Sequence, residues 1–207
     1  MNWRWIKKDS RFTQVNPILE KIMRGTAKIS SELFDHVPEY RPFHDNETAA
    51  VSLLTGGAAR MGLAPVAEYP VDKKTWRAVR KKFHYKLSDL DQKHIMKGRA
   101  DLSISNGDRF FSFEFKRSSE RSWRKLGKRG LRSNLKSLHS YAIEEICRVD
   151  DDEYHHALAG LIVPVFDSSD EDVFKEFAEE TSLCMSLGSK DAYKVYFYFS
   201  TLSKYEN

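Results

Sequence analysis

The chain has 207 residues, of which 41% are hydrophobic and 31% are charged, and its formal net charge is +4. This length and composition predict one ordinary folded domain, and no segment approaches the roughly 18 apolar residues that a membrane-spanning helix needs. The N-terminus lacks the apolar core of a signal peptide, and Cys147 and Cys184 are too few for a disulfide framework, which favours a reducing cytoplasm.

Residues 1–45 are predicted to form a helical extension that packs on a main domain of residues 46–207. Asn16-Pro17 provides a cap and an N1 proline, and Gly25 a terminal glycine, so a short helix is expected between them, with a second helix at residues 30–36. A dimer contact and a substrate-facing arm are alternative roles for this extension.

A helix is expected to begin after Asn46, which is a good N-cap residue. Gly56-Gly57 weakens its second half, and Gly62 is expected to end it. Four residues of this helix share one stripe: Glu47, Ala50, Val51 and Leu54. Glu47 is therefore an acid in the first turn that points with the apolar residues, either because the helix dipole favours it or because it belongs to a metal site.

The first strand of the main domain is predicted at residues 63–71, with prolines near both ends. Glu68 lies within it as a reserve candidate ligand, although a surface charge is the simpler interpretation. The next two strands, residues 98–105 and 109–116, are predicted to form a hairpin around the turn dipeptide Asn106-Gly107. Both arms alternate in the two-residue period of strands, so one face carries apolar residues and the other carries polar ones.

The register of this hairpin decides which side chains meet. A two-residue turn pairs Ser105 with Asp108, buries the phenylalanines on one face, and places Asp101 diagonal to Glu114 on the other, about 7–8 Å away at Cα. One additional turn residue would put the two carboxylates on opposite faces. The register that buries the aromatic rings is therefore the register that gathers the acids.

After the hairpin, a core-facing apolar stripe predicts a helix over residues 131–149. The nearly continuous apolar run at 157–166 is typical of a strand buried on both faces. A capping box of Ser168 and Glu171 predicts a further helix, and residues 193–201 are expected to form the last strand. Because helices and strands interleave, we predict an α/β fold with a central mixed β-sheet flanked by helices.

Asp101, Glu114 and Lys116 share the polar face of the hairpin. Two converging carboxylates repel each other unless a cation lies between them, and such oxygen-rich pairs suit Mg²⁺, for which Mn²⁺ can substitute. A lysine two residues along the same strand can hold an attacking water or stabilise charge on phosphorus. These groups would serve phosphodiester hydrolysis; an exposed hairpin face with ordinary charges is the simpler alternative.

The motifs and the order of segments resemble the PD-(D/E)XK nuclease superfamily, which has the restriction-endonuclease-like fold. Asp101 matches the motif aspartate and Glu114-Phe115-Lys116 the (D/E)XK tripeptide, whereas Ala100 stands at the proline position. The likeness covers roughly residues 46–166, and at most extends to 201. It implies an αβββαβ core in which Asp101 and Glu114 bind metal, Lys116 is catalytic, and Glu47 is a further acid that assists directly or through water.

Positive charge is concentrated in two stretches around the hairpin. Residues 73–86 hold seven basic residues and no acid, and residues 116–136 hold nine basic residues and one acid. Each stretch contains a tryptophan, Trp76 or Trp123, that can stack on a base or pack inward. Such segregation favours polyanion binding, although a solvated basic helix face is the alternative. Five residues are predicted to hold backbone phosphates: Lys81, Arg117, Arg121, Arg124 and Lys128.

The histidines show no zinc-binding motif. His44 and His139 are the ones that could approach the proposed site, but structural or surface roles are expected for both. Serine and cysteine triads, glycine-rich phosphate loops and dinucleotide-binding motifs are missing from the sequence as well.

Taken together, these patterns predict a cytoplasmic, Mg²⁺-dependent nuclease, with a DNA endonuclease as the first choice and a homodimer left open. Two alternatives remain: a non-catalytic nucleic-acid-binding domain with the same fold, and a protein-interaction module. Contacts with the phosphate backbone carry no sequence information, so neither the target nor a choice between DNA and RNA follows from these residues.

Overall fold

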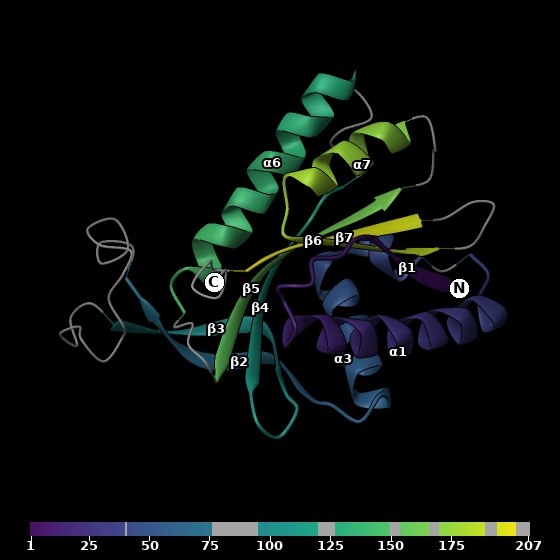
Figure 1. Cartoon of the computed structure of the whole chain (residues 1–207). Coiled ribbons are helices and arrows are strands. Elements are labelled where there is room, and N and C mark those ends of the chain that lie inside the picture. Colours follow the sequence, from purple (N-terminus) through teal and green to yellow (C-terminus); the bar gives the residue numbers. More distant parts are fainter. Residues whose placement is uncertain are drawn as a thin grey trace.

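The computed structural model describes residues 1–39, 41–75, 95–119, 127–149, 154–165, 170–188 and 194–201. Within them the fold is α/β, with a seven-stranded mixed sheet and helices on both of its faces (Figure 1). The strands are β1 (Asn2–Lys7), β2 (Ala64–Lys74), β3 (Ile95–Ser105), β4 (Phe110–Arg117), β5 (His155–Val165), β6 (Leu183–Gly188) and β7 (Lys194–Thr201). The helices are α1 (Val15–His36), α2 (Pro42–Asp45), α3 (Glu47–Arg60), α6 (Gly127–Ile146) and α7 (Glu171–Glu179).

The sheet has the strand order β1-β6-β7-β5-β4-β3-β2, and all neighbours are antiparallel except β4 and β5, which are parallel. Helices α1 and α3 cover one face, and α6 and α7 cover the other (Figure 1). The stacked rings of Phe113 and Phe115 belong to the core under α1 and α3. On the opposite face, Tyr198 packs edge-to-face against Phe177 of α7.

The N-terminal segment contributes to the sheet as well as to its helical cover. Strand β1 pairs with β6, and the half-buried Trp3 and Trp5 pack against the core. The helix that follows, α1, is one continuous element of 22 residues. The prediction of two short helices in this region is therefore wrong, because Gly25 lies inside α1 and does not end a helix.

Gly25 instead marks the close crossing of α1 and α3. A Cβ atom built on Gly25 would lie 2.9 Å from the Cα atom of Gly57 in α3. A Cβ atom on Gly57 would in turn lie 2.5 Å from the main-chain nitrogen of Thr26 and 2.9 Å from the carbonyl oxygen of Ile22. Both glycines are thus needed for backbone-to-backbone approach, and α3 continues unbroken through Gly57 to Arg60.

The two adjacent glycines of α3 should respond in opposite ways to the same substitution. Gly57→Ala places a methyl group against rigid backbone and should cost roughly 1–3 kcal/mol of unfolding free energy. Gly56→Ala is the matched control, because its Cβ would meet only the terminal methyl of Ile29, at 3.2 Å. It should be neutral or stabilise by up to about 1 kcal/mol through helix propensity. Urea unfolding of both variants measures this, and equal effects would contradict the proposed crossing.

The hairpin keeps the predicted faces but not the predicted register. Ser105 pairs with Phe110, so four residues connect the strands, and the expected pairing of Ser105 with Asp108 is wrong. The Oδ1 atom of Asn106 accepts the main-chain N–H groups of Asp108 at 3.1 Å and Arg109 at 2.9 Å, which closes the longer loop. Because the slip is two residues, each side chain stays on its predicted face.

The remaining expectations match the described elements closely. The N-cap Asn46 accepts the N–H of Ala49 at 2.7 Å, and α3 ends before Gly62, whose φ is +75°. Helices α6 and α7 and strands β5 and β7 lie where the patterns predicted them. Ser168 of the predicted capping box lies outside the described residues, and strand β6 was not predicted. No helix in the described part of the chain is long and apolar enough to cross a membrane.

Candidate active site

The observed register brings Asp101 and Glu114 near each other. Leu102 pairs with Phe113 inside the core, and regular pairing of β3 and β4 ends there. One further step in this register would set Asp101 opposite Glu114, and the charge of Asp101 raises the pKa of Glu114. The Asp101 carboxylate accepts the main-chain N–H of Phe115 at 2.6 Å, so it takes the place of a ladder hydrogen bond. The register therefore differs from the predicted diagonal one, and Asp101 lies one step beyond the last regular pair.

A row of polar side chains continues along this face of the sheet. The hydroxyl oxygens of Ser103 and Ser112 lie 3.0 Å apart, and that of Ser112 lies 2.8 Å from Nε2 of His155 on β5. Ser112 is buried, so its hydroxyl is a structural hydrogen-bonding group and not an accessible nucleophile. The row shows that the polar face under α6 is internally hydrogen-bonded, as buried polar groups must be.

Glu47 reaches the end of β4 from the first turn of α3. Its Oε1 atom lies 3.7 Å from Nζ of Lys116, and its carboxylate also accepts the main-chain N–H of Arg117. Lys116 Nζ donates to the carbonyl oxygen of Phe115 at 2.8 Å. These contacts, together with the charge effects of Asp101 on Glu47 and Glu114, show that Glu47, Asp101, Glu114 and Lys116 are neighbours in the structure.

The electrostatics of the three carboxyl groups are coupled. Burial raises the pKa of Asp101 and of Glu47, and it raises the pKa of Glu114 to about 7. The negative charge of Asp101 further raises the pKa values of both Glu47 and Glu114, so Asp101 is close to both. Positive charge offsets these effects in part, because Lys116 lowers the pKa of Glu47, Lys73 lowers that of Glu114, and both lower that of Asp101.

Lys73 is a member of the site that the sequence did not reveal. It is 5% exposed, and its Nζ atom forms an ion pair with Oε1 of Glu114. The predicted strand ended at Val71, whereas β2 continues to Lys74. Lys73 therefore looked like the first residue of a solvated basic stretch, and no local pattern distinguishes it from its basic neighbours.

Glu68 lies beside this site and affects it only through its charge. Glu68 faces Asp101 across β2 and β3, has a φ of +53°, and is omitted from the regular pairing. Its exposed side chain lies 3.7 Å from the Arg99 guanidinium. Glu68 therefore acts on Asp101 through its charge, which is one of the causes that raise the pKa of Asp101, after burial.

The donor set suits a hard divalent cation held by few protein ligands. Among the described residues, no three His, Cys, Asp or Glu side chains are close enough together to hold a metal ion. Mg²⁺ is commonly bound by one or two carboxylates and keeps several waters, so Asp101 and Glu114 provide a sufficient pair of oxygen ligands. Glu47 is already engaged by the Lys116 ammonium and by the main-chain N–H of Arg117.

Of the five residues expected to hold phosphates, Arg117 and Lys128 are among the described residues. Lys81, Arg121 and Arg124, together with Trp76 and Trp123, lie outside the described residues. The Arg117 guanidinium donates to the carbonyl oxygens of His44 at 2.7 Å and Asp45 at 3.3 Å. These contacts attach the end of β4 to the segment that leads into α3, so Arg117 positions Glu47. Lys128 is exposed near the N-terminal end of α6.

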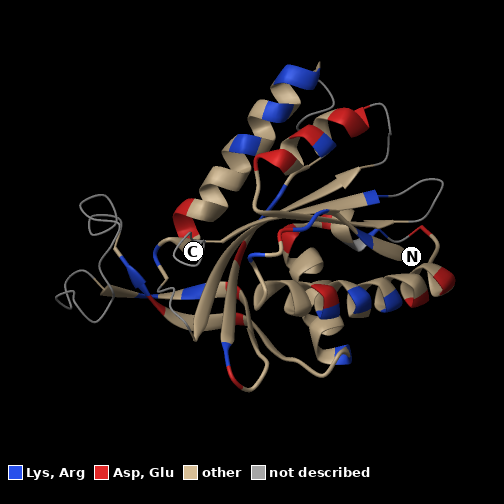
Figure 2. Cartoon of the chain, in the orientation of Figure 1, with Lys and Arg blue, Asp and Glu red and all other residues tan. Residues whose placement is uncertain are grey.

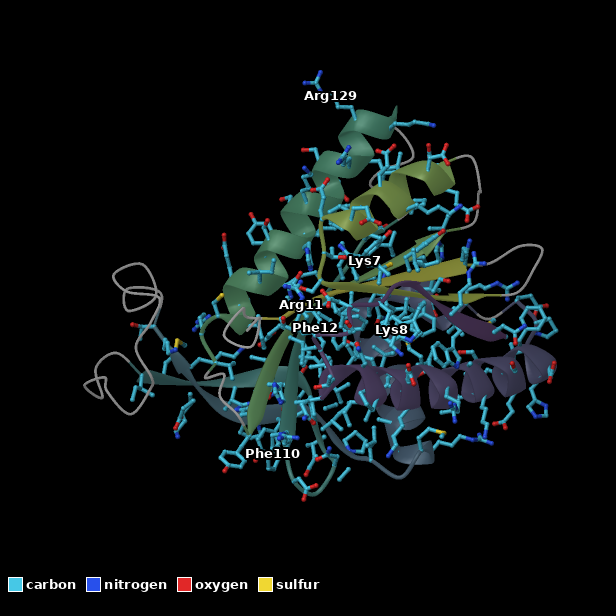
Figure 3. All side chains as sticks on the ribbon, in the orientation of Figure 1. Lys7, Lys8, Arg11, Phe12, Phe110 and Arg129 are labelled. Carbon is cyan, nitrogen blue, oxygen red and sulfur yellow. The ribbon has the colours of Figure 1, made fainter. Side chains whose placement is uncertain are left out.

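Part of the basic stretch is neutralised within the molecule. In Figure 2, basic residues follow the first turns of α6 beside the acidic α7. Arg132 Nη2 lies 2.5 Å from an oxygen of Glu180, and Lys136 Nζ lies 2.8 Å from the other. Arg129, at the N-terminal end of α6, points away from the fold (Figure 3). The segregated charges seen in the sequence therefore partly face each other in the structure.

His139 lies away from the site. It is buried on α6, with its ring in an edge-to-face contact 5.9 Å from that of Phe177, and burial lowers its pKa to about 4. His44 contributes its main-chain carbonyl to Arg117. A structural role, as expected from the sequence, accounts for these contacts of both histidines.

No protein-family model matches the chain, and no curated protein matches it significantly. The interpretation of the site therefore depends on its own geometry and chemistry. The residues that carry this interpretation are Asp101, Glu114, Lys116, Glu47 and Lys73.

Replacing Arg117 tests its attachment to the start of α3. Arg117→Met should lower the free energy of unfolding by about 1–3 kcal/mol, because two carbonyl groups lose a charged donor. The matched control is Arg129→Met at the exposed end of α6, which should change stability by less than about 0.5 kcal/mol. Chemical denaturation measures both values, and an unchanged stability for Arg117→Met would show that the guanidinium does not hold this segment.

His139 should make folding stability sensitive to acid. Its pKa is lowered from 6.5 to about 4 on folding, so the unfolded chain binds the proton more readily than the folded chain. The corresponding stability is fully present above pH 6.5 and is lost as pH falls toward 4, an effect on the order of 3 kcal/mol. Relative to wild type, His139→Gln should flatten the decline in stability over this range.

The control for that measurement is His36→Gln, since His36 is exposed at the end of α1. This variant should retain the wild-type dependence of unfolding free energy on pH. A slope for His139→Gln that equals the wild-type slope would show that the histidine is not held neutral by burial.

Proposed function

We propose that this chain is a metal-dependent nuclease that hydrolyses phosphodiester bonds, with DNA as the favoured substrate. The observation that carries the proposal is the closeness of Asp101 and Glu114 just beyond the last β3–β4 pair, with the Lys116 ammonium near enough to lower the pKa of Asp101. Two oxygen ligands and a nearby ammonium group are the components that metal-assisted attack on phosphorus needs.

The order of elements supports a restriction-endonuclease-like core for this site. Among the described elements, α3, β2, β3, β4, α6 and β5 follow one another in the chain, which is the helix, three strands, helix, strand order of the PD-(D/E)XK superfamily. The first three strands are antiparallel neighbours, and β5 returns parallel to β4 through α6. Fold alone does not establish activity, so the proposal depends on the side chains of the site.

In the proposed mechanism each residue has a defined task. Asp101 and Glu114 would hold Mg²⁺, or Mn²⁺ in its place, which when bound polarises the scissile phosphate and lowers the pKa of a coordinated water. Lys116 would orient the attacking water and stabilise the negative charge that develops on the phosphate oxygens. Glu47 would hold the Lys116 ammonium in position through their 3.7 Å ion pair and would support the site through water.

Substrate binding would depend on exposed basic residues around this site. Lys128 and Arg129 are exposed at the N-terminal end of α6 and are available to backbone phosphates. Arg117 is not proposed as a phosphate-binding residue, because its guanidinium donates to the main-chain carbonyls of His44 and Asp45. Because one site cleaves one strand, cutting of both strands would call for two copies of the chain, and a homodimer is part of this proposal for duplex substrates.

A non-catalytic nucleic-acid-binding domain is the second candidate. The buried ion pair between Lys73 and Glu114 favours it, because an internal ammonium group already neutralises one of the two proposed ligands. This candidate predicts that the protein retains DNA but that divalent cations cause no cleavage.

The nuclease proposal predicts a separation of cleavage from binding. Asp101→Ala or Lys116→Ala should reduce Mg²⁺-dependent cleavage by at least about 100-fold, the usual contribution of a single catalytic group. Affinity for nucleic acid, measured in Ca²⁺, should change little. The control Lys28→Ala removes an exposed lysine of α1 and should cleave at the wild-type rate. Duplex, single-stranded and branched DNA and RNA serve as substrates, and undiminished cleavage by Asp101→Ala would refute the proposed site.

A further inference from the structure

Lys73 is a buried cation that has no role in the proposed mechanism. It is 5% exposed, and Glu114, its partner, is 4% exposed. Removing a charged pair from water is costly, and its retention in a protein interior requires close pairing and additional compensating groups. The groups around Lys73 must therefore compensate the cost of burying its charge.

The path of the Lys73 side chain depends on Gly98 in the neighbouring strand β3. A Cβ atom on Gly98 would lie 2.7 Å from Cδ and 3.1 Å from Cγ of Lys73. The absence of a side chain at this position lets the aliphatic stem run close to the β3 backbone toward β4. The Lys73 side chain thus occupies the space that a side chain at position 98 would need.

The backbone next to Lys73 is held by the segment after α6. The main-chain N–H of Lys74 donates to the carbonyl oxygen of Arg148 at 2.8 Å, and Nε of Arg148 donates to the carbonyl oxygen of Lys74 at 3.0 Å. This reciprocal pair fixes the end of β2 relative to α6. The main chain from which the Lys73 side chain extends is therefore held by two hydrogen bonds at the adjacent residue.

The ammonium group lies between two carboxylates. Lys73 Nζ contacts Oε1 of Glu114 and lies 3.9 Å from Oε2 of Glu145, which also pairs with Nη1 of Arg148 at 2.9 Å. Two cations and two anions thus compensate one another in a cluster in which only Glu145 is partly exposed. Because Lys73 is enclosed in this cluster, it is not a surface group for phosphate binding.

We propose that Lys73 is a positioning residue that acts through Glu114. By occupying one oxygen of the Glu114 carboxylate, it fixes the orientation of that group and leaves the second oxygen for a divalent cation shared with Asp101. Without the ammonium group, Glu114 would face the Asp101 and Glu145 carboxylates uncompensated and would turn away from the shared position. This inference rests on the proposed function, since it assigns Glu114 as a metal ligand.

The test is the affinity for Mn²⁺, measured from the electron paramagnetic resonance signal of the free ion in the absence of nucleic acid. Lys73→Met keeps the length of the stem and removes the charge, and it should weaken Mn²⁺ binding by about 10–100-fold, the usual effect of losing a group that orients a metal ligand. Gly98→Ala keeps the charge but obstructs the stem, and it should weaken binding in the same direction. The matched control is Lys97→Met, an exposed lysine of β3, which should bind as wild type does.

A double-variant cycle separates positioning from a general structural role. In a Glu114→Gln background, Lys73→Met should change Mn²⁺ affinity by less than about twofold, because its effect passes through Glu114. The same double variant should also recover stability toward urea relative to Lys73→Met alone, since no uncompensated buried carboxylate remains at Glu114. Lys73→Arg, which keeps the charge, provides a folded comparison if Lys73→Met does not fold, and it should bind Mn²⁺ more tightly than Gly98→Ala.

The outcomes distinguish this inference from the proposed function. Unchanged or tighter Mn²⁺ binding by Lys73→Met would overturn the positioning role and would leave the nuclease proposal standing, because tighter binding would identify Lys73 as a competitor for Glu114. If Lys73→Met does not fold, tighter binding by Gly98→Ala than by wild type would overturn it in the same way. Absence of Mn²⁺ binding by the wild-type protein would overturn both.

Discussion

The pairing of β3 with β4 is the constraint on which both the core and the candidate site depend. Three phenylalanines of β4 are buried under α1 and α3, and each such ring contributes roughly 1.5–3 kcal/mol. Two unit charges 4 Å apart repel by about 4 kcal/mol at an effective dielectric constant of 20. Burial of three rings is enough to outweigh a repulsion of this size, and the Lys73 ammonium further offsets the charge of Glu114.

Pairing of opposite charges between distant segments is the second theme of the structure. Glu114 is paired with Lys73 from β2 and Glu47 with Lys116 from β4, and Glu176 of α7 and the adjacent Glu180 are paired with basic residues of α6. These pairings join segments that are far apart in the chain. Within the described residues, the segregation of charge along the sequence therefore overstates the free charge, because some of the basic side chains pair with acids of other segments.

Local periodicity accounts for the parts of the fold that were predictable. The start of α3 at the Asn46 cap, the buried run of β5 and the alternating faces of the hairpin follow from side-chain direction and capping chemistry within a few residues. Gly25 shows the limit of such reasoning. A glycine that ends a helix and a glycine at a helix crossing have the same local sequence signature, and only the position of Gly57 in space distinguishes them.

The candidate site shows the same division between local and distant causes. The sequence by itself determined the α/β alternation and the side of the sheet on which Asp101, Glu114 and Lys116 lie, because a strand has a period of two residues regardless of its neighbours. Only the tertiary structure decided the four-residue connection, which shifts the hairpin register by two residues from the predicted one. It also decided the inward course of Lys73 and the attachment of Arg117 to the segment before α3. Long basic side chains reach partners set by other strands and helices, so their roles depend on packing that no local pattern records.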